Sequence, residues 1–283
     1  GPGEYKDIGS IDVNPANGEL YLKEMNRQQI HVYSLDGKFK HSFTFPEGKR
    51  MSRMCLFSPD YLIAEQESKV PDDQDANFYP YLLVSTRDGH LDSLDYVQKR
   101  NILVKLIVNA ENHSYAYLLE PSLIRNGSRF YIGNPDSDTL FAMNPDRTLE
   151  PLLVRTPSHS EEGNKYGLFL RGAAGAYFFL TKQPMEVPMN SIESLDLKSE
   201  EWLYDCRTQE VCRYLLKNKD DASKRVEGIM FFCYPEDCGL AVLKSEDLMD
   251  AYEAGQLSGE LKEIAAGLKA DDNPVLMLIH FKK

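Results

Sequence analysis

An acidic and aromatic segment in the first third of the chain has the residue types of a ligand-binding loop. Asp73, Asp75 and Asn77 follow the D-x-D-x-N spacing with which calcium loops begin. The glycine expected next is Phe78, and Val84 stands where the bidentate glutamate would fall, so an EF-hand is excluded. A looser calcium site is left open as the weak cofactor alternative, and no other cofactor is expected.

The aromatic residues of the same loop add a second kind of recognition. Phe78 and Tyr79 could stack on a sugar ring or a peptide, or they could pin the loop to the fold beneath it. Similar acidic spacing recurs at Asn134, Asp136 and Asp138 in a shorter loop. The candidate ligand-binding residues of the first loop are Asp72, Asp73, Asp75, Phe78 and Tyr79.

Methionines mark a third candidate segment. Met185, Val187 and Met189 alternate with prolines nearby. A methionine-rich loop suits an adaptable protein interface, because the thioether side chain is flexible and polarisable. The same residues could equally cover the end of the core, and the sequence does not distinguish this role from a protein interface.

The five cysteines offer disulfide chemistry more readily than metal chemistry. Cys233 and Cys238 bracket a four-residue turn, which brings them within disulfide reach on a hairpin. Cys206 and Cys212 bracket five residues and need a bulge or an irregular loop. Export would permit both disulfides, whereas a reducing compartment would leave these four cysteines as buried thiols. Cys55 belongs to neither pair and is expected to be a buried thiol. Zinc is not predicted, because short CxxC spacings and companion histidines are missing.

Catalytic motifs are missing from the sequence. The six histidines form no HExxH pair, and there is no GxSxG, phosphate loop or GxGxxG. The histidines are His31, His41, His90, His113, His159 and His280. Paired carboxylates for glycoside hydrolysis are spatial and leave no sequence pattern. The sequence therefore favours a protein without enzymatic activity and assigns no catalytic residue.

Charge and hydropathy exclude two classes of partner. The formal net charge is −12 and no basic stripe appears, which argues against nucleic acid and against an anionic membrane surface. No stretch approaches the ~20 apolar residues that a transmembrane helix needs. The 283 residues, 42% of them hydrophobic, suffice for a sizeable core.

The elements that must position these residues are short strands in sets of four. Ile8 to Val13, Glu19 to Lys23, Ile30 to Leu35 and Lys38 to Phe45 alternate with turn residues, including Asp36-Gly37. Four strands in about forty residues is the size of one propeller blade.

The same order of strands and turns recurs along the chain. A β-sandwich or barrel of similar strand count is the alternative, since strands at this spacing fit both. The internal order favours an all-β propeller of four-stranded antiparallel blades, with five units visible. The second unit is predicted over Met54 to Phe57, Tyr61 to Glu65, Tyr81 to Ser85 and His90 to Val97. The third is predicted over Ser122 to Arg125, Arg129 to Gly133, Thr139 to Met143 and Leu149 to Arg155. The fourth is predicted over Leu168 to Arg171, Ala176 to Thr181, Trp202 to Cys206 and Val211 to Leu216, with a turn at Gly172 to Gly175.

The fifth unit departs from the pattern by two short helices near the C-terminus. Its strands are predicted at Gly228 to Cys233, Gly239 to Lys244 and Val275 to Phe281, the last apolar on both faces as in a doubly buried strand. Ser245 is predicted as the N-cap of the first helix and Gly255 as its end. The second helix is predicted from Leu261, Ile264, Ala265 and Leu268.

Three segments resemble one known family. The opening GPGEY (1–5), VYSLDGKF (32–39) and the closing DDNPVLMLIHFK (271–282) resemble six-bladed, NHL-like β-propeller proteins of Bacteroidetes. The resemblance implies an exported protein, periplasmic or at the cell surface and often lipid-anchored, of a family whose members mostly have no established activity. It also implies six blades, with a whole blade before the GPGEY segment. We therefore expect a single propeller domain over residues 1–283 and leave open that an N-terminal blade is lacking.

The long loops indicate where function would lie. In each blade the loop between the second and third strands opens opposite the two tight hairpins, and insertions gathered on one face usually mark the binding face. Such insertions run from Glu67 to Pro80, from Lys182 to Ser199, and through both helices. We expect a binding or scaffold protein that holds a glycan or protein partner on this face. The alternative is a metal-assisted hydrolase or lactonase with carboxylates at the central channel, since the fold supports either.

Overall fold

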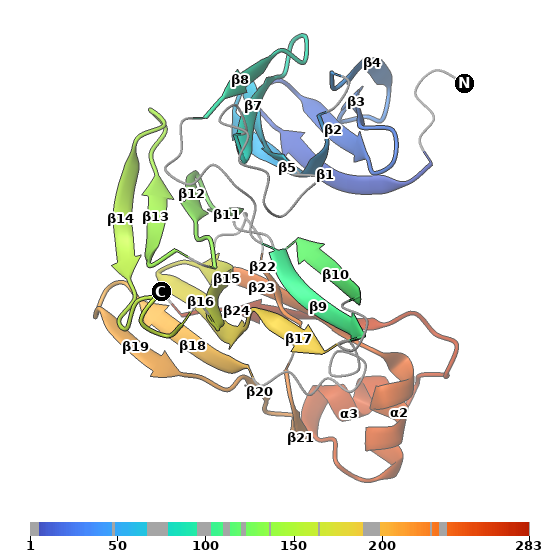
Figure 1. Ribbon diagram of the computed structural model, residues 1–283. Helices are drawn as coiled ribbons and strands as arrows, with labels where there is room; N and C mark the ends of the chain where they lie inside the picture. The colour runs from blue at the N-terminus through green and yellow to red at the C-terminus, as the bar shows by residue number, and fades with distance from the viewer. Residues whose placement is uncertain are drawn as a thin grey trace. The chain divides into compact units, whose positions relative to one another are not determined.

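The protein is built almost entirely of β-strands, as the computed structural model in Figure 1 shows. The described strands form seven sheets, and two helices lie near the C-terminus. The structure describes residues 6–46, 49–66, 79–94, 103–109, 114–119, 123–135, 137–163, 165–188, 199–226, 228–231 and 237–282.

The first blade confirms the predicted four-strand unit. Its strands pair in chain order as an antiparallel meander, and they are β1 (Ile8–Asn14), β2 (Glu19–Glu24), β3 (Gln29–Ser34) and β4 (Phe39–Thr44). The two hairpins turn at Gly18 and Gly37, whose φ angles are 64° and 83°. Glycine is favoured at both positions because a Cβ is strained in the left-handed region.

Three further blades repeat this order. In each of them short turns join the first strand to the second and the third strand to the fourth, which only antiparallel pairing allows. The second blade comprises β5 (Met51–Ser58), β6 (Tyr61–Gln66), β7 (Tyr81–Ser85) and β8 (Leu91–Ser93). The third comprises β11 (Leu123–Asn126), β12 (Arg129–Ile132), β13 (Thr139–Met143) and β14 (Leu149–Val154). The fourth comprises β15 (Tyr166–Ala174), β16 (Tyr177–Pro184), β18 (Glu200–Asp205) and β19 (Glu210–Arg213).

The fifth blade has three described strands and carries the helices. Its sheet has the order β22 (Met230–Phe231), β23 (Cys238–Leu243) and β24 (Val275–His280). Between β23 and β24 the chain forms α2 (Ser245–Glu253) and α3 (Gly259–Ala265), as predicted. Gly255 follows the end of α2 with a φ of 69°, which confirms the predicted helix stop.

The predicted N-cap of α2 was wrong. The N-cap residue is Lys244, and Ser245 is the first helical residue and is buried. The Ser245 hydroxyl donates to the backbone oxygens of Asp272 (3.1 Å) and Asn273 (2.8 Å) instead of capping the helix. This hydroxyl therefore fastens the start of the insertion to its end, a role that depends on a partner 27 residues away.

The predicted burial of the last strand on both faces was also wrong. Along β24 intermediate and exposed residues alternate, with Leu276 64% and Leu278 53% exposed. Among the described residues one face of β24 packs against its neighbours and the other points to solvent, as the alternation shows.

In the fourth blade one turn lies later in the chain than predicted. The Gly172 to Gly175 segment was predicted as a turn, but β15 continues to Ala174 through a register shift between Leu170 and Gly172. A Cβ on Gly172 would lie 1.9 Å from Cδ2 of Phe231, so this position requires glycine for a close approach between strands.

Two small sheets lie outside the predicted units. One has the order β10 (Ser114–Leu119), β9 (Leu103–Asn109) and β17 (Glu186–Pro188), with β17 parallel to β9. The other is a hairpin of β20 (Lys217–Asn218) and β21 (Asp221–Arg225), in the connection between the fourth and fifth blades.

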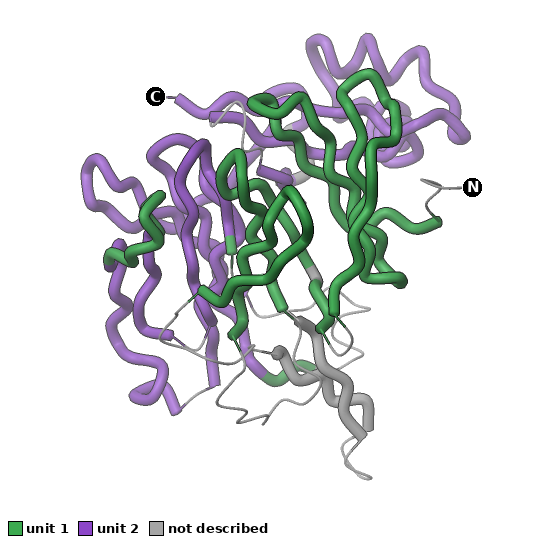
Figure 2. The backbone as a smooth tube through the Cα atoms, turned by 90° about the horizontal axis from the view of Figure 1, so that it is seen from above, with its two compact units in different colours: residues 1–123, 143–150, 186–190 green, residues 124–142, 151–185, 191–283 purple. Residues whose placement is uncertain are grey.

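The chain divides into two compact units, coloured separately in Figure 2. The first comprises residues 1–123, 143–150 and 186–190, and the second comprises residues 124–142, 151–185 and 191–283. Within the first unit the facing sides of blades one and two share one apolar core. That core consists of Tyr21, Ile30, Val32, Phe45, Met51, Met54, Leu56, Leu62, Ala64, Leu82 and Val84.

Within the second unit the fourth blade packs on both of its faces. Phe178 of β16 lies 4.7 Å from Tyr131 of the third blade, measured between ring centroids. The adjacent Phe179 points to the other face, where its ring lies 4.5 Å from Phe231 and 5.1 Å from Phe281 of the fifth blade. A sandwich sheet has one inner face, whereas a propeller blade is covered on both by its neighbours, so the propeller prediction is confirmed.

A repeated hydrogen bond joins successive blades. Asn14 ends β1 and donates from Nδ2 to the backbone oxygen of Pro59, in the first turn of the next blade, at 2.9 Å. Asn126 ends β11 and donates in the same way to Gly175 of the fourth blade, at 3.0 Å. Both asparagines are buried, so each bond satisfies a polar group at a blade interface.

Candidate functional site

The helical insertion of the fifth blade walls one side of a pocket of about 440 Å³. The opposite wall is the β20–β21 hairpin, and β23 lies between them. This volume falls within the range of sites that bind small molecules or short peptide segments. The residues that line the pocket are Asn218, Asp221, Arg225, Val226, Val242, Leu243, Lys244, Asp247, Leu248 and Leu261.

Backbone contacts fix the two walls against each other. The amide of Ser258, between the helices, donates to the backbone oxygen of Asp220 in the hairpin turn at 2.8 Å. Asp221 forms an isolated bridge with Leu257. Gly259 has a φ of 53°, and a Cβ there would lie 2.6 Å from Oδ1 of Asp220, so the close approach of the two walls requires glycine.

The helices hold their shape through a small core of their own. Five buried apolar side chains pack together in the insertion, and this packing keeps its pocket wall in place. These side chains are Leu248, Ala251, Leu257, Leu261 and Ala265.

The pocket presents both signs of charge beside apolar surface. Arg225 and Lys244 supply exposed cationic groups, and Asp247 supplies an exposed carboxylate. Asn218 is positioned by donating from Nδ2 to Sδ of Met277 at 3.1 Å. Among the described residues, no aromatic ring belongs to the lining. The arrangement can hold a ligand with both charged and apolar groups.

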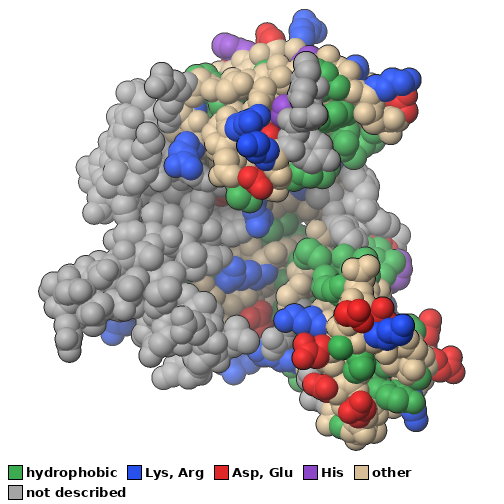
Figure 3. All heavy atoms as spheres, turned by 90° about the vertical axis from the view of Figure 1, so that its right-hand side faces the viewer, with side chains coloured by type: hydrophobic (Ala, Val, Ile, Leu, Met, Phe, Trp, Pro, Cys, Tyr) green, Lys and Arg blue, Asp and Glu red, His purple; other side chains and the backbone are tan. Residues whose placement is uncertain are grey.

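The outer surface of the insertion is acidic. Glu246, Asp250, Glu253, Glu260 and Glu263 are all exposed on α2 and α3. Figure 3 shows the side on which these helices lie in Figure 1, where acidic side chains stand among exposed apolar and basic ones. A ligand that approaches this pocket therefore passes a surface that favours positive charge.

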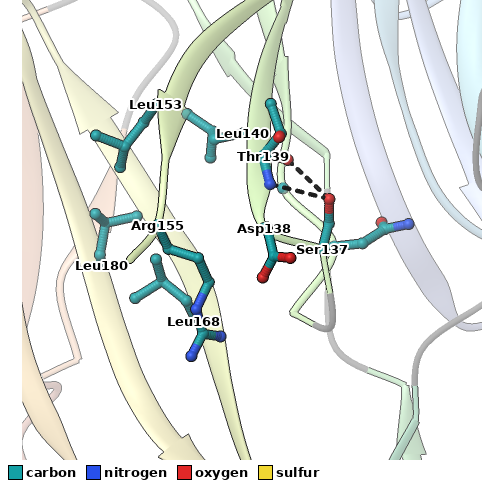
Figure 4. A pocket seen from close by; sticks show the side chains of 10 residues that line it. Ser137, Asp138, Thr139, Leu140, Leu153, Arg155, Leu168 and Leu180 are labelled. Carbon is teal, nitrogen blue, oxygen red and sulfur yellow. Dashed lines mark hydrogen bonds between the residues drawn. The ribbon is translucent and has the colours of Figure 1, made fainter. Parts of the chain in front are cut away.

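A second cavity lies within the third and fourth blades and is far smaller. Figure 4 shows Asp138, Leu140, Leu153, Arg155 and Leu180 among the side chains around it. Its volume of about 10 Å³ is the size of a single water molecule. This cavity is therefore too small for an organic ligand.

Arg155, which lines this cavity, belongs to an ion network. The Glu162 carboxylate accepts hydrogen bonds from both Arg155 and Lys182. The Arg155 side chain is 8% exposed and that of Glu162 is 16% exposed. Hydrogen bonding to Lys182, opposed by burial and helped by the positive charges of Lys182 and Arg155, lowers the pKa of Glu162 below its usual range. The network neutralises a buried arginine and has a structural role.

The structure brings together few of the residues predicted to bind ligand. Asp72, Asp73, Asp75, Phe78 and Met189 lie outside the described residues. Tyr79 is described and packs against the core of the first and second blades. Met185 is half-buried, and Val187 is buried within β17.

The cysteine predictions have two outcomes. Cys206 and Cys212 are exposed and free in the structure, and the strand register places Cys212 opposite Leu203. Cys233 lies outside the described residues. The thiol of Cys238 lies 3.1 Å from Nδ1 of His280 on the neighbouring strand.

One group among the described residues has the chemistry of a metal site. Asp237, Cys238 and His280 place an oxygen, a sulfur and a nitrogen within 4.8 Å of one another. This group was not predicted from the sequence, because Cys238 and His280 are 42 residues apart and meet only through strand pairing. In the described part of the chain no cluster of three carboxylates was found that would support the hydrolase alternative.

The pocket residues were missed for a similar reason. The sequence located the insertion but gave no signal for Arg225 or Lys244, which are ordinary surface residues in local context. Only the docking of the β20–β21 hairpin against the insertion brings them into one lining.

The architecture defines the class of protein: an all-β propeller of four-stranded blades, five of which are described, with a helical insertion that forms a pocket. Residues 1–280 match the family model described as a domain of unknown function, DUF4934. The chain belongs to this family. The six blades implied by the resemblance are not seen among the described residues.

Solved structures from Bacteroides share the fold. A candidate exported protein from Bacteroides fragilis is 14% identical with a TM-score of 0.65, over 100% of this chain and 79% of the other. A member of the DUF4221 family from Bacteroides vulgatus is 8% identical with a TM-score of 0.53, over 99% and 80% of the two chains. No curated protein matches the sequence. At these identities the likeness concerns the fold alone.

In the described part of the chain, no helix is long and apolar enough to cross a membrane.

Proposed function

We propose that this chain is an exported binding protein that holds a partner at the pocket of the helical insertion, without covalent chemistry. The observation that carries the proposal is the pocket of about 440 Å³, with cations and carboxylates around an apolar floor. The insertion is one of the long connections between second and third strands that the sequence assigned to the binding face. Periplasmic or cell-surface location with a lipid anchor, and an NHL-like ring of six blades, belong to the same proposal. They are supported by the family resemblance and by the exported-protein description of the Bacteroides fragilis neighbour.

The lining favours a protein partner over a glycan. A glycan site is strengthened by an aromatic ring for the sugar face, and the described residues of the pocket lining include none. Arg225 and Lys244 suit a carboxylate, while Asp221 and Asp247 suit a cationic side chain. The acidic surface of α2 and α3 further favours a partner segment with net positive charge.

The test screens the purified chain against a glycan array and a library of short charged peptides. The double variant R225A/K244A removes the two cations, and D221N/D247N removes the two carboxylates. The matched control is K262A, an exposed lysine of α3 outside the pocket lining.

We expect the wild type to bind selectively those peptides that have a net positive charge and also carry a carboxylate for Arg225 and Lys244. Each double variant should weaken this binding at least about tenfold, which corresponds to about 1.4 kcal/mol. The control should bind like the wild type. Glycan binding lost in the same double variants would replace the protein partner by a glycan at the same site. Binding that survives both double variants, or falls equally in K262A, would refute the pocket as the site.

A further inference from the structure

Strand pairing brings a thiol and an imidazole together at one end of the fifth blade. In the register of β23 and β24, Cys238 lies directly opposite His280. The next pair is hydrogen-bonded, since the amide of Phe281 donates to the backbone oxygen of Asp237 at 2.8 Å. Hydrogen-bonded and non-hydrogen-bonded pairs alternate, so Cys238 and His280 form the kind of pair in which side chains approach most closely. Their Sγ and Nδ1 atoms are 3.1 Å apart.

A carboxylate completes a three-donor cluster. Oδ1 of Asp237 lies 3.7 Å from the sulfur of Cys238. In a tetrahedral zinc site, metal–sulfur bonds of about 2.3 Å and metal–nitrogen or metal–oxygen bonds of about 2.0–2.1 Å separate the donors by roughly 3.4–3.6 Å. The two measured distances lie on either side of that separation. A cation could therefore be enclosed by side-chain adjustments of a few tenths of an ångström.

The burial of the three residues leaves one side of the cluster open. Cys238 is fully buried, Asp237 is half-buried and His280 is exposed. A cation bound here would have a buried sulfur ligand and a coordination position open to solvent. Thiolate and imidazole together select zinc and similar transition metals over calcium and magnesium, which prefer oxygen.

We propose that Asp237, Cys238 and His280 form a binding site for a thiophilic divalent cation such as zinc. The site clamps the start of β23 to the end of β24, the two strands that carry the helical insertion. It is independent of the proposed pocket, which lies at the other end of these strands around Val242 and Lys244. Because the cation binds the folded strand pair, it also raises the thermal stability of the protein by mass action.

The test is a titration of the full chain with Co²⁺, whose complexes with thiolates absorb strongly in the near ultraviolet. A non-thiol reductant is present throughout, because a disulfide between Cys233 and Cys238 would consume the same sulfur. We expect a thiolate–cobalt band that saturates at one equivalent and disappears when Zn²⁺ is added, since zinc binds such sites more tightly. Mg²⁺ should leave the band unchanged.

Variants assign the band to the three residues. C238S should abolish it, and H280Q and D237N should each weaken Co²⁺ binding at least tenfold. The matched controls are C206S and C212S, which remove the exposed free thiols of the fourth blade and should leave the band unchanged. His280 is exposed, so H280Q tests the site without disturbing the core.

Two results would overturn the proposal. One is the absence of a thiolate–cobalt band in the reduced wild-type protein, which would leave the Cys238–His280 contact as a hydrogen bond only. The other is a band that survives in C238S and H280Q or disappears in the control variants. Neither result bears on peptide binding at the pocket, so the two proposals can fail separately.

Discussion

At the scale of single residues, one carboxylate in the connection between the third and fourth blades binds two cations. Glu162 accepts hydrogen bonds from Arg155, which lies at the end of the third blade's last strand, and from Lys182 of β16. Because the folded state binds a proton to Glu162 less readily than the unfolded state does, the group stabilises the fold only while it is ionised. Its contribution is complete above the ordinary glutamate pKa and is lost as the pH falls through the lowered value.

Replacing this carboxylate should therefore cost stability in a pH-dependent way. We expect E162Q to unfold with a free energy about 1–3 kcal/mol lower than the wild type at neutral pH, because a nearly buried arginine loses its charged partner. The difference should shrink when the pH is taken well below 4.5, the unperturbed value for glutamate. Urea unfolding at the two pH values measures it, with E150Q on exposed β14 as the control. A difference that is equal at both pH values would show that charge is not involved.

At the scale of elements, the repeated asparagine makes the clearest prediction. Asn126 is buried and donates across a blade interface to Gly175, so N126A leaves the Gly175 carbonyl without this donor. We expect a loss of about 1–3 kcal/mol in the free energy of unfolding. The half-buried Asn144, whose side chain bonds to Thr148 within its own turn, is the matched control, and N144A should cost much less. Equal losses in denaturant melts of the two variants would contradict a role in joining blades.

Strands that close locally could be predicted from the sequence, and elements that pair at long range could not. Asp36-Gly37 and Asn126-Gly127 mark hairpins within a few residues, and the structure has positive φ at Gly37 and Gly127. By contrast, β17 is three residues long and pairs with β9, some eighty positions earlier, through a register that no local pattern encodes. The two-residue strand β20 is likewise too short to show an alternation.

The same contrast explains the site. The insertion that walls the pocket was predicted from helical periodicity and capping residues, which are local. The lining was not, because Arg225 and Lys244 come from separate elements. The metal-type cluster was missed because Cys238 and His280 face each other only through the β23–β24 register.

At the scale of the whole molecule, the alternation of side chains along a central strand is what distinguishes this fold from a sandwich. Successive residues of β16 face opposite neighbours, since Phe178 contacts the third blade and Phe179 the fifth. Because side chains alternate between the two faces of a strand, neighbouring residues of β16 contact the blade before it and the blade after it. The sixth blade implied by the family resemblance stays a prediction.

Truncating either phenylalanine should loosen a different neighbour. Both are almost fully buried, so F178A and F179A should each lower the free energy of unfolding by about 3–5 kcal/mol. Amide hydrogen exchange separates them, because the cavity lies on opposite faces of the blade. F178A should speed exchange in β12 and β13, and F179A should speed it in β22 and at the end of β24, because Phe231 and Phe281, the residue after β24, lose their ring contact. If both variants sped exchange in the same set of strands, the two faces of this blade would not be covered by different blades, and the propeller assignment would fail.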